Sequence, residues 1–370
     1  MDSKIIIHLI KRKKYFKKKS GRKRLKYLYY IIIIIIIIIS FKFNIIKLYN
    51  TKKEKISINE QNNKNNIKLR KQMFKLLSKI SNKTITSLDD VYLGNFYRLG
   101  NSLLALNKVI FYCEIMQCKR IFLNKYYYPL IKNTIYDKKY GLTISILTDF
   151  KKNNITSLFH WPRPFITTLI KRPESRFDVF KEEILNNLPK PSINKNDLYI
   201  HIRNGDIYNK RPRGRYYAQP PLCFYKKVIQ QNKFTNVYII AVNVNFTIIQ
   251  KLITEYKNTK YIGTSIKEDA AKLVYAYNIV ASISSFLTCL IKFNDNLKYL
   301  WEYDIYHRGT KINHLHHSVL NFTRKYTIYR MKPSSIYLEK MNIWRKTNEQ
   351  LNLMINDTCP NNFTIIKPNK

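Results

Sequence analysis

The sequence predicts an α/β protein of two domains behind a single N-terminal transmembrane helix and a stem. Three observations lead to this prediction. Strand-like and helix-like runs alternate through the second half of the 370-residue chain, two prolines interrupt the pattern near residue 190, and nine consecutive isoleucines follow a basic N-terminus. With 45% hydrophobic and 14% aromatic residues, the chain can bury one large or two ordinary cores. Disorder throughout is therefore excluded.

The first 49 residues are typical of a signal anchor. Residues 1–26 hold twelve basic residues and one acidic residue, whereas residues 27–41 carry no charge. Extended to residue 49, the apolar segment reaches the ~20 residues that a helix needs to cross a bilayer, because Lys42 and Lys47 can reach the membrane surface. Basic flanks stay in the cytosol, so the body is expected in the lumen. A cleaved signal peptide is the alternative, but no small-residue cleavage site follows the span.

These features predict a single-pass type II protein of the Golgi or endoplasmic reticulum membrane. Residues 1–26 would be the cytosolic tail, residues 27–49 the anchor, and the polar residues 50–88 a solvated stem, with a marginal helix as the alternative. Six N-x-S/T sequons follow the span and none precedes it. The five cysteines are compatible with one or two disulfides and an odd thiol, in a pairing that the sequence leaves open.

The net charge of +44 at first suggests nucleic acid or an anionic membrane surface as a partner. The chain has 17 arginines against 50 lysines, and Ile, Asn and Tyr are also heavily used. This uniform excess is typical of base-composition drift in the coding DNA. The basic residues outside the tail are spread along the chain, so we expect no nucleic-acid partner and contact with the membrane only through the N-terminal helix.

The body is expected to form an N-terminal α/β domain over residues 89–190 and a C-terminal α/β domain over residues 191–370. In the first, the pattern predicts a helix at 102–116 and strands at 120–123 and 143–147. In the second, it predicts strands at 198–203, 236–242, 279–282 and 299–303, helices at 222–231, 246–256, 267–277 and 284–293, and a closing helix at 335–354. Such alternation predicts parallel pairing, with ligands at the carboxyl ends of the strands.

A cluster of polar residues follows the first strand of the second domain. His201 and Arg203 fall on one face of the strand, and Gly205 and Asp206 come directly after them. A guanidinium group suits phosphate oxygens, and glycine lets the backbone turn close to a ligand. The alternative is an arginine–aspartate pair that only closes a loop.

Two helix starts could also bind an anion through their free N–H groups. Arg98, Gly100 and Asn101 open the first helix of the body, and Ser284, Ser285 and Phe286 open a later one. Ordinary helix capping is the alternative at both places.

The three motifs, H-x-R-x-G-D, R-x-G-N and S-x-S-S-F, resemble those of the fucosyltransferase superfamily, which includes α1,2-fucosyltransferases and protein O-fucosyltransferases. The resemblance covers about residues 90–305. It implies a GT-B pair of Rossmann-like domains and an inverting, metal-independent transfer of fucose from GDP-fucose, with no resident cofactor. The acceptor would be a hydroxyl of a glycan or glycoprotein.

The resemblance also implies roles for individual residues. Arg203 would clamp the diphosphate, and His201 would bind the donor sugar or nucleotide. The remaining donor-site residues would be Arg98, Gly100 and Asn101 near the phosphate or acceptor, Ser284, Ser285 and Phe286 on the nucleotide, and Asp269 on the base.

The chain departs from the family pattern at two places. Asn204 stands where many relatives carry a second arginine, and Leu287 and Thr288 replace tryptophans that often follow the serine motif. These departures bear on the identity of the transferred sugar more than on the binding of a nucleotide diphosphate.

The acceptor hydroxyl needs a general base. Asp206 is the nearest candidate, with Glu268 and Asp269 behind it, although Asp206 could instead orient Arg203. We expect no metal site, because no D-x-D motif follows the anchor and the histidines at 314, 316 and 317 lack a companion set of ligands. The alternative function is a membrane-anchored glycan-binding protein of the same fold without catalysis.

Overall fold

The computed structural model describes residues 67–75, 77–78, 89–93, 98–147, 159–160, 175–208, 218–305, 325–341, 343–360 and 362–368. The expected cytosolic tail, the anchor at residues 27–49 and most of the stem lie outside these ranges. Residues 67–75 and 77–78 are helical, and Met73 and Leu77 are buried. Among the described residues, no helix combines the length and the hydropathy needed to cross a membrane.

The first sheet contains five strands in the order β3-β4-β2-β1-β5. These are β1 (Asp90–Leu93), β2 (Arg120–Asn124), β3 (Ile135–Asp137), β4 (Leu142–Leu147) and β5 (Phe159–His160). All neighbours pair in parallel except β3 and β4, which form an antiparallel pair. The predicted strands at 120–123 and 143–147 are confirmed as β2 and β4.

Helix α2 (Leu99–Met116) connects β1 to β2 and confirms the predicted helix at 102–116. Its apolar residues are buried along most of its length, and it ends where Gln117 adopts a left-handed backbone conformation with φ of 62°. Helix α4 (Asp178–Asn187) follows this sheet and was not predicted. Residues 188–197 contain neither helix nor strand and lead into the second sheet.

The second sheet contains seven strands in the order β12-β11-β10-β9-β6-β7-β8. They are β6 (Leu198–Ile202), β7 (Val237–Ala241), β8 (Thr259–Tyr261), β9 (Asn278–Ala281), β10 (Tyr299–Tyr303), β11 (Thr327–Met331) and β12 (Thr364–Ile366). Strands β6 to β11 pair in parallel, and β12 is antiparallel to β11. Numbered along the chain, the six parallel strands lie in the order 3-2-1-4-5-6, that of a doubly wound, Rossmann-like sheet.

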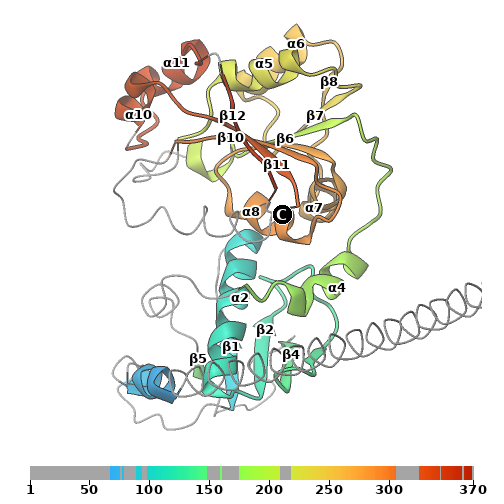
Figure 1. The fold of residues 1–370 in the computed structure, drawn as a ribbon, viewed down its shortest axis with the longest axis vertical. Coiled ribbons are helices and arrows are strands. Elements are labelled where there is room, and N and C mark those ends of the chain that lie inside the picture. The colour runs from blue at the N-terminus through green and yellow to red at the C-terminus, as the bar shows by residue number, and fades with distance from the viewer. Residues whose placement is uncertain are drawn as a thin grey trace, which may run out of the picture. The chain divides into compact units, whose positions relative to one another are not determined.

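Helices cover both faces of this sheet. Helices α5 (Leu222–Gln231) and α6 (Thr247–Glu255) lie on one face, and α7 (Ile266–Tyr275) and α8 (Ser285–Leu290) lie on the other (Figure 1). Every residue of β6 is buried, as expected for a central strand covered on both sides. The predicted α/β class with parallel pairing is therefore confirmed. From Gln72 onward, the chain forms one compact unit that contains both sheets.

The predicted closing helix at 335–354 is wrong as a single element. The structure has two helices, α10 (Ser335–Met341) and α11 (Asn348–Asn356). Lys346 takes a left-handed backbone conformation with φ of 58°, and Thr347 then starts α11 through a capping box with Gln350. Between the two helices, the buried Trp344 ring donates a hydrogen bond of 2.8 Å to the carbonyl of Ile207.

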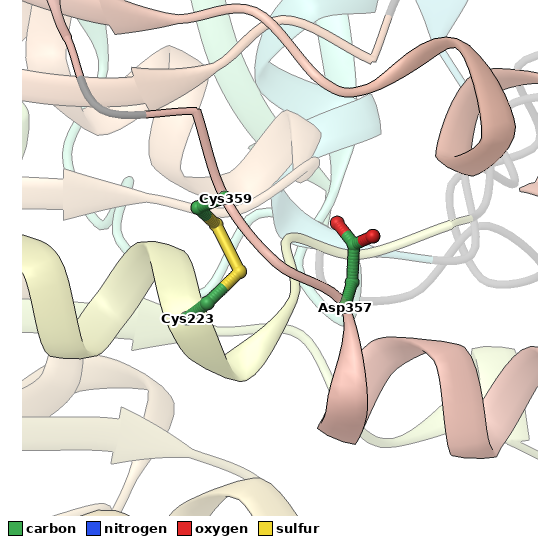
Figure 2. A group of neighbouring side chains, drawn as sticks. All are labelled: Cys223, Asp357 and Cys359. Carbon is green, nitrogen blue, oxygen red and sulfur yellow. A yellow bond between two sulfur atoms is a disulfide. The ribbon is translucent and has the colours of Figure 1, made fainter.

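One disulfide joins α5 to the segment after α11. Cys223 and Cys359 are 136 residues apart in the chain, and their Cα atoms are 5.6 Å apart (Figure 2). Cys113, Cys118 and Cys289 are buried free thiols. Two of the five cysteines thus form one disulfide, and the other three are thiols. The sequence had allowed one or two disulfides.

Candidate active site

Two central strands of the second sheet separate at their carboxyl ends. The ladder between β6 and β9 ends at the pair Ile200 and Val280, whereas the ladder between β6 and β7 continues to Ile202 and Ala241. Strands β6 and β9 are the first and fourth in the 3-2-1-4-5-6 order, so their carboxyl ends form the topological switch point. Doubly wound sheets bind their ligands at this point.

The hydroxyl group of Ser282 bridges the two strands beyond the end of their ladder. It accepts a hydrogen bond of 3.2 Å from the backbone N–H of Arg203, and it lies 2.7 Å from Nδ1 of His201. Ser282 and His201 are both buried, at 8% and 7% exposure. The hydroxyl therefore fixes the side chain of His201 and the backbone of Arg203 at the topological switch point.

His201 is neutral at physiological pH. Burial lowers the pKa of its imidazole to about 3, and the positive charge of Arg203 lowers it further in the same direction. The Ser282 hydroxyl already accepts from Arg203, so its own hydrogen is available for Nδ1. We assign the tautomer from this network, with the ring hydrogen on Nε2. In this form His201 is a hydrogen-bond donor rather than a strong base.

The side chain of Arg203 links two of the sequence motifs. Its Nη1 atom lies 3.4 Å from the carbonyl oxygen of Ile283, the residue before Ser284, and its side chain is partly buried. The imidazole of His201 lies 5.9 Å from the ring of Phe286. The structure therefore brings the H-x-R motif beside the S-x-S-S-F motif.

Helix α8 contains only six residues, and its N-cap Ser284 makes no side-chain capping hydrogen bond. Thr288 instead donates its hydroxyl hydrogen to the carbonyl of Ser284 at 2.8 Å. Ser284 is buried, whereas Ser285 and Phe286 are partly exposed. Side chains of this segment, rather than the dipole of so short a helix, are the groups that a ligand could meet.

Gly100 has a packing role that the sequence did not reveal. A Cβ atom at this position would lie 2.5 Å from the carbonyl carbon of Ser285 and 2.6 Å from Cα of Phe286. The Sγ atom of Cys289 lies 3.2 Å from the carbonyl oxygen of Gly100. The R-x-G-N motif therefore lets the start of α2 contact the backbone of α8, while Arg98 and Asn101 beside it are exposed.

Asn204 holds the loop after β7. In the sequence, this residue was notable only because many fucosyltransferases have an arginine at this position. Its Oδ1 atom accepts hydrogen bonds from the backbone N–H groups of Val242 and Asn243 at 3.0 and 3.1 Å. Its Nδ2 atom donates to the carbonyl of Asn243. Asn204 is buried, and the signal for this role is its position two residues beyond the end of β6. Val242, at 80% exposure, is an exposed apolar residue at this same edge.

Asp269 lies at a different part of the same edge, after β8. Its Oδ1 atom accepts hydrogen bonds from the backbone N–H and the hydroxyl of Thr264 at 3.1 and 3.4 Å. Burial raises the pKa of this carboxyl group, and the Thr264 hydrogen bonds oppose that shift. Glu268, its neighbour, is exposed. The base-recognition role of Asp269 stays a prediction.

Several predicted groups fall outside what the structure describes. Asp206 begins the short helix η1 (Asp206–Tyr208), but its side chain is outside the described part, so its role as base stays a prediction. The histidines at 314, 316 and 317 also lie outside it.

One group of potential metal ligands is present among the described residues, at Cys223, Asp357 and Cys359. Both sulfur atoms belong to the disulfide, and only the carboxylate of Asp357 remains (Figure 2). A single carboxylate does not make a metal centre. The two cysteines therefore form a covalent cross-link, and Asp357 lies beside it.

Comparisons of the chain with protein-family models, with curated proteins and with solved structures found no match.

Proposed function

We propose that the protein is a membrane-anchored glycosyltransferase of GT-B fold that transfers fucose from GDP-fucose to a hydroxyl of a glycan or glycoprotein. One observation carries the proposal: Ser282 holds His201 and Arg203 together at the switch point of a sheet with the 3-2-1-4-5-6 order. Crevices at this point suit nucleotides, and a guanidinium group suits a diphosphate.

The reaction would be an inverting displacement. The acceptor oxygen attacks the anomeric carbon of fucose from the face opposite GDP, a base removes the hydroxyl proton, and the breaking bond leaves its electron pair on the β-phosphate oxygen. Arg203 would stabilise the negative charge that develops there. With a pKa near 3, His201 suits donation of a hydrogen bond from Nε2 better than removal of the proton. The proposed base is Asp206.

Two observations support a luminal location for the body. The Cys223–Cys359 disulfide is of the kind that persists in the oxidising secretory pathway. The sequons at Asn245, Asn356 and Asn362 lie at exposed residues, where an oligosaccharide would meet no packed neighbour. A type II anchor in the Golgi or endoplasmic reticulum membrane would place the body there.

The second candidate is an anchored glycan-binding protein without catalysis, and Asn204 favours it. This side chain occupies the position of a second arginine in many fucosyltransferases, and its polar groups hold the loop after β7. The departing diphosphate would then have one cation fewer than in those enzymes.

A donor-turnover assay tests the proposal. The full-length chain is incubated with GDP-fucose and a mixture of glycan acceptors, and GDP release is measured. We expect Arg203→Ala to lower the rate at least hundredfold, the loss typical of removing one transition-state donor. Arg345→Ala, which removes an exposed arginine between α10 and α11, is the matched control and should change the rate less than twofold. Equal rates in the wild type and the Arg203 variant would reject the proposed site, and the absence of turnover with retained GDP binding would favour the glycan-binding protein.

A further inference from the structure

A cavity lies at the edge of the second sheet opposite the switch point. Its volume is about 390 Å³, and its lining comes from residues before or at the starts of β6, β7, β9 and β10. Because these strands are parallel, their starts and ends lie at opposite edges of the sheet. This amino-edge cavity, which includes Lys195, Lys233, Lys298, Phe234, Tyr299 and Trp301 in its lining, is therefore separate from the candidate active site.

The lining is positively charged and contains no acidic residue. Lys195 and Lys298 both approach the ring of Tyr277, with their ammonium nitrogens 6.0 and 5.8 Å from its centroid. Within the described residues, neither they nor Lys233 takes part in a salt bridge. The nearby carboxylate of Asp197 is buried and accepts a hydrogen bond of 3.0 Å from Asn236. The positive charge of these ammonium groups would attract an anion to the cavity.

The walls of the cavity are held in place by hydrogen bonds. The amide of Asn278 donates to the carbonyls of Lys195 and Asp197 at 2.8 and 2.9 Å. The backbone N–H of Thr235 donates to the carbonyl of Asn196 at 3.0 Å, and that of Lys298 donates to Tyr277 at 2.8 Å. The backbone that lines the cavity is thus held in place without a ligand.

Aromatic side chains supply the other part of the lining. Tyr299 is 40% exposed, and its ring centroid lies 6.0 Å from that of Trp301. Trp301 is itself stacked on Tyr329 at 5.3 Å and meets Phe234 edge to face at 5.7 Å. Rigid aromatic surface of this kind suits the apolar face of a sugar ring, and the volume is in the range of small-ligand sites.

We propose that the amino-edge cavity binds an anionic sugar, a saccharide that carries a sulfate or phosphate ester. The ammonium groups of Lys195 and Lys298 would bind the ester, and Tyr299 would contact the sugar ring. The ester could belong to a sulfated glycan or to a sugar phosphate, which share this chemistry. The inference does not depend on the proposed transferase activity.

The test is calorimetric titration of the full-length chain, in non-ionic detergent, with four probes: N-acetylglucosamine 6-sulfate, N-acetylglucosamine 6-phosphate, N-acetylglucosamine and inorganic sulfate. We expect at least one ester to bind ten times more tightly than either the neutral sugar or sulfate, and the tighter of the two esters identifies the source. The double variant Lys195→Met/Lys298→Met should weaken that binding at least tenfold.

Three further variants make the outcome specific. Lys251→Met/Lys257→Met removes the same charge from exposed positions on and just after α6, and Tyr299→Ala removes the ring. The lysine control should change the affinity for the ester less than twofold. Tyr299→Ala should weaken binding of the ester but not binding of inorganic sulfate. Arg203→Ala should leave ester binding unchanged. The proposal would be overturned if neither ester binds, or if inorganic sulfate binds as tightly as the esters. It would also be overturned if the lysine control weakens ester binding as much as Lys195→Met/Lys298→Met does, or if Arg203→Ala weakens it.

Discussion

Replacement of Ser282 by alanine removes the hydroxyl that joins the carboxyl ends of β6 and β9. The backbone N–H of Arg203 and Nδ1 of His201 would lose partners at 3.2 and 2.7 Å. Loss of a hydrogen bond from a buried or partly buried group costs about 1–3 kcal/mol, so loss of the two bonds predicts a decrease of about 2–6 kcal/mol in the free energy of unfolding. Urea denaturation at pH 7, followed by circular dichroism, measures this loss directly.

The chain offers a matched control at Thr259, whose hydroxyl is also buried but has no hydrogen-bond partner within the described structure. Thr259→Val keeps the shape and removes only this unpaired hydroxyl, so it should be neutral or slightly stabilising. Ser282→Thr, which restores a hydroxyl, should recover part of the loss.

A spectroscopic measurement separates the positioning of His201 from simple stability. The ¹⁵N shifts of the His201 ring, assigned by comparison with His201→Gln, should report Nε2–H in the wild type and a mixture of tautomers in Ser282→Ala. If Ser282→Ala is as stable as Thr259→Val and the His201 shifts do not change, the bridging role of Ser282 is refuted.

Three other perturbations test separate parts of the structure. Gly100→Ala should lower stability by about 3 kcal/mol or more, because its methyl group would lie 2.5–2.6 Å from backbone atoms of α8. Unchanged urea denaturation together with loss of GDP binding would show instead that Gly100 contacts the ligand. Serine at both Cys223 and Cys359 should cost about 2–5 kcal/mol, because the disulfide closes a long loop, and denaturation that is insensitive to reductant would contradict this. The pKa of His201 is about 3 in the folded state and about 6.5 in the unfolded state, so only the unfolded state binds the proton between these pH values. The free energy of unfolding should therefore fall by about 2 kcal/mol as the pH is lowered from 6.5 to 5. His201→Gln should lack this component, and identical pH profiles for the two chains would show that His201 is not buried as described.

The regular elements of the second sheet were predictable because their patterns are strong. The strand at 299–303 and the helix at 222–231 have the predicted bounds, since each is a clear apolar or amphipathic run. Strands β8, β11 and β12 were missed. Strands β8 and β12 have only three residues each, some of them exposed. The closing helix was predicted as one element because the left-handed turn at Lys346 has no glycine to announce it.

The sequence predicted which residue types form the candidate site, but not the hydrogen bonds between them. Strand alternation places His201 and Arg203 on one face, yet nothing in the sequence reveals that Ser282, 79 residues after Arg203, binds both. That contact depends on which strands are neighbours in the sheet. In the same way, Gly100 suggested a ligand until its distance from the α8 backbone gave it a packing role.

Binding of nucleotides tests the central claim most directly. The thermal unfolding of the full-length chain is followed with GDP, UDP and CDP, each with and without EDTA, in the wild type, Arg203→Ala and the control Arg345→Ala. A ligand at 100 times its dissociation constant adds ~2.7 kcal/mol to stability. We expect GDP to raise the unfolding temperature of the wild type and the control, in EDTA as well, and to leave that of Arg203→Ala unchanged. A response to UDP alone would exclude GDP-fucose as the donor, and no response to any nucleotide from a folded chain would contradict the nucleotide-binding site itself.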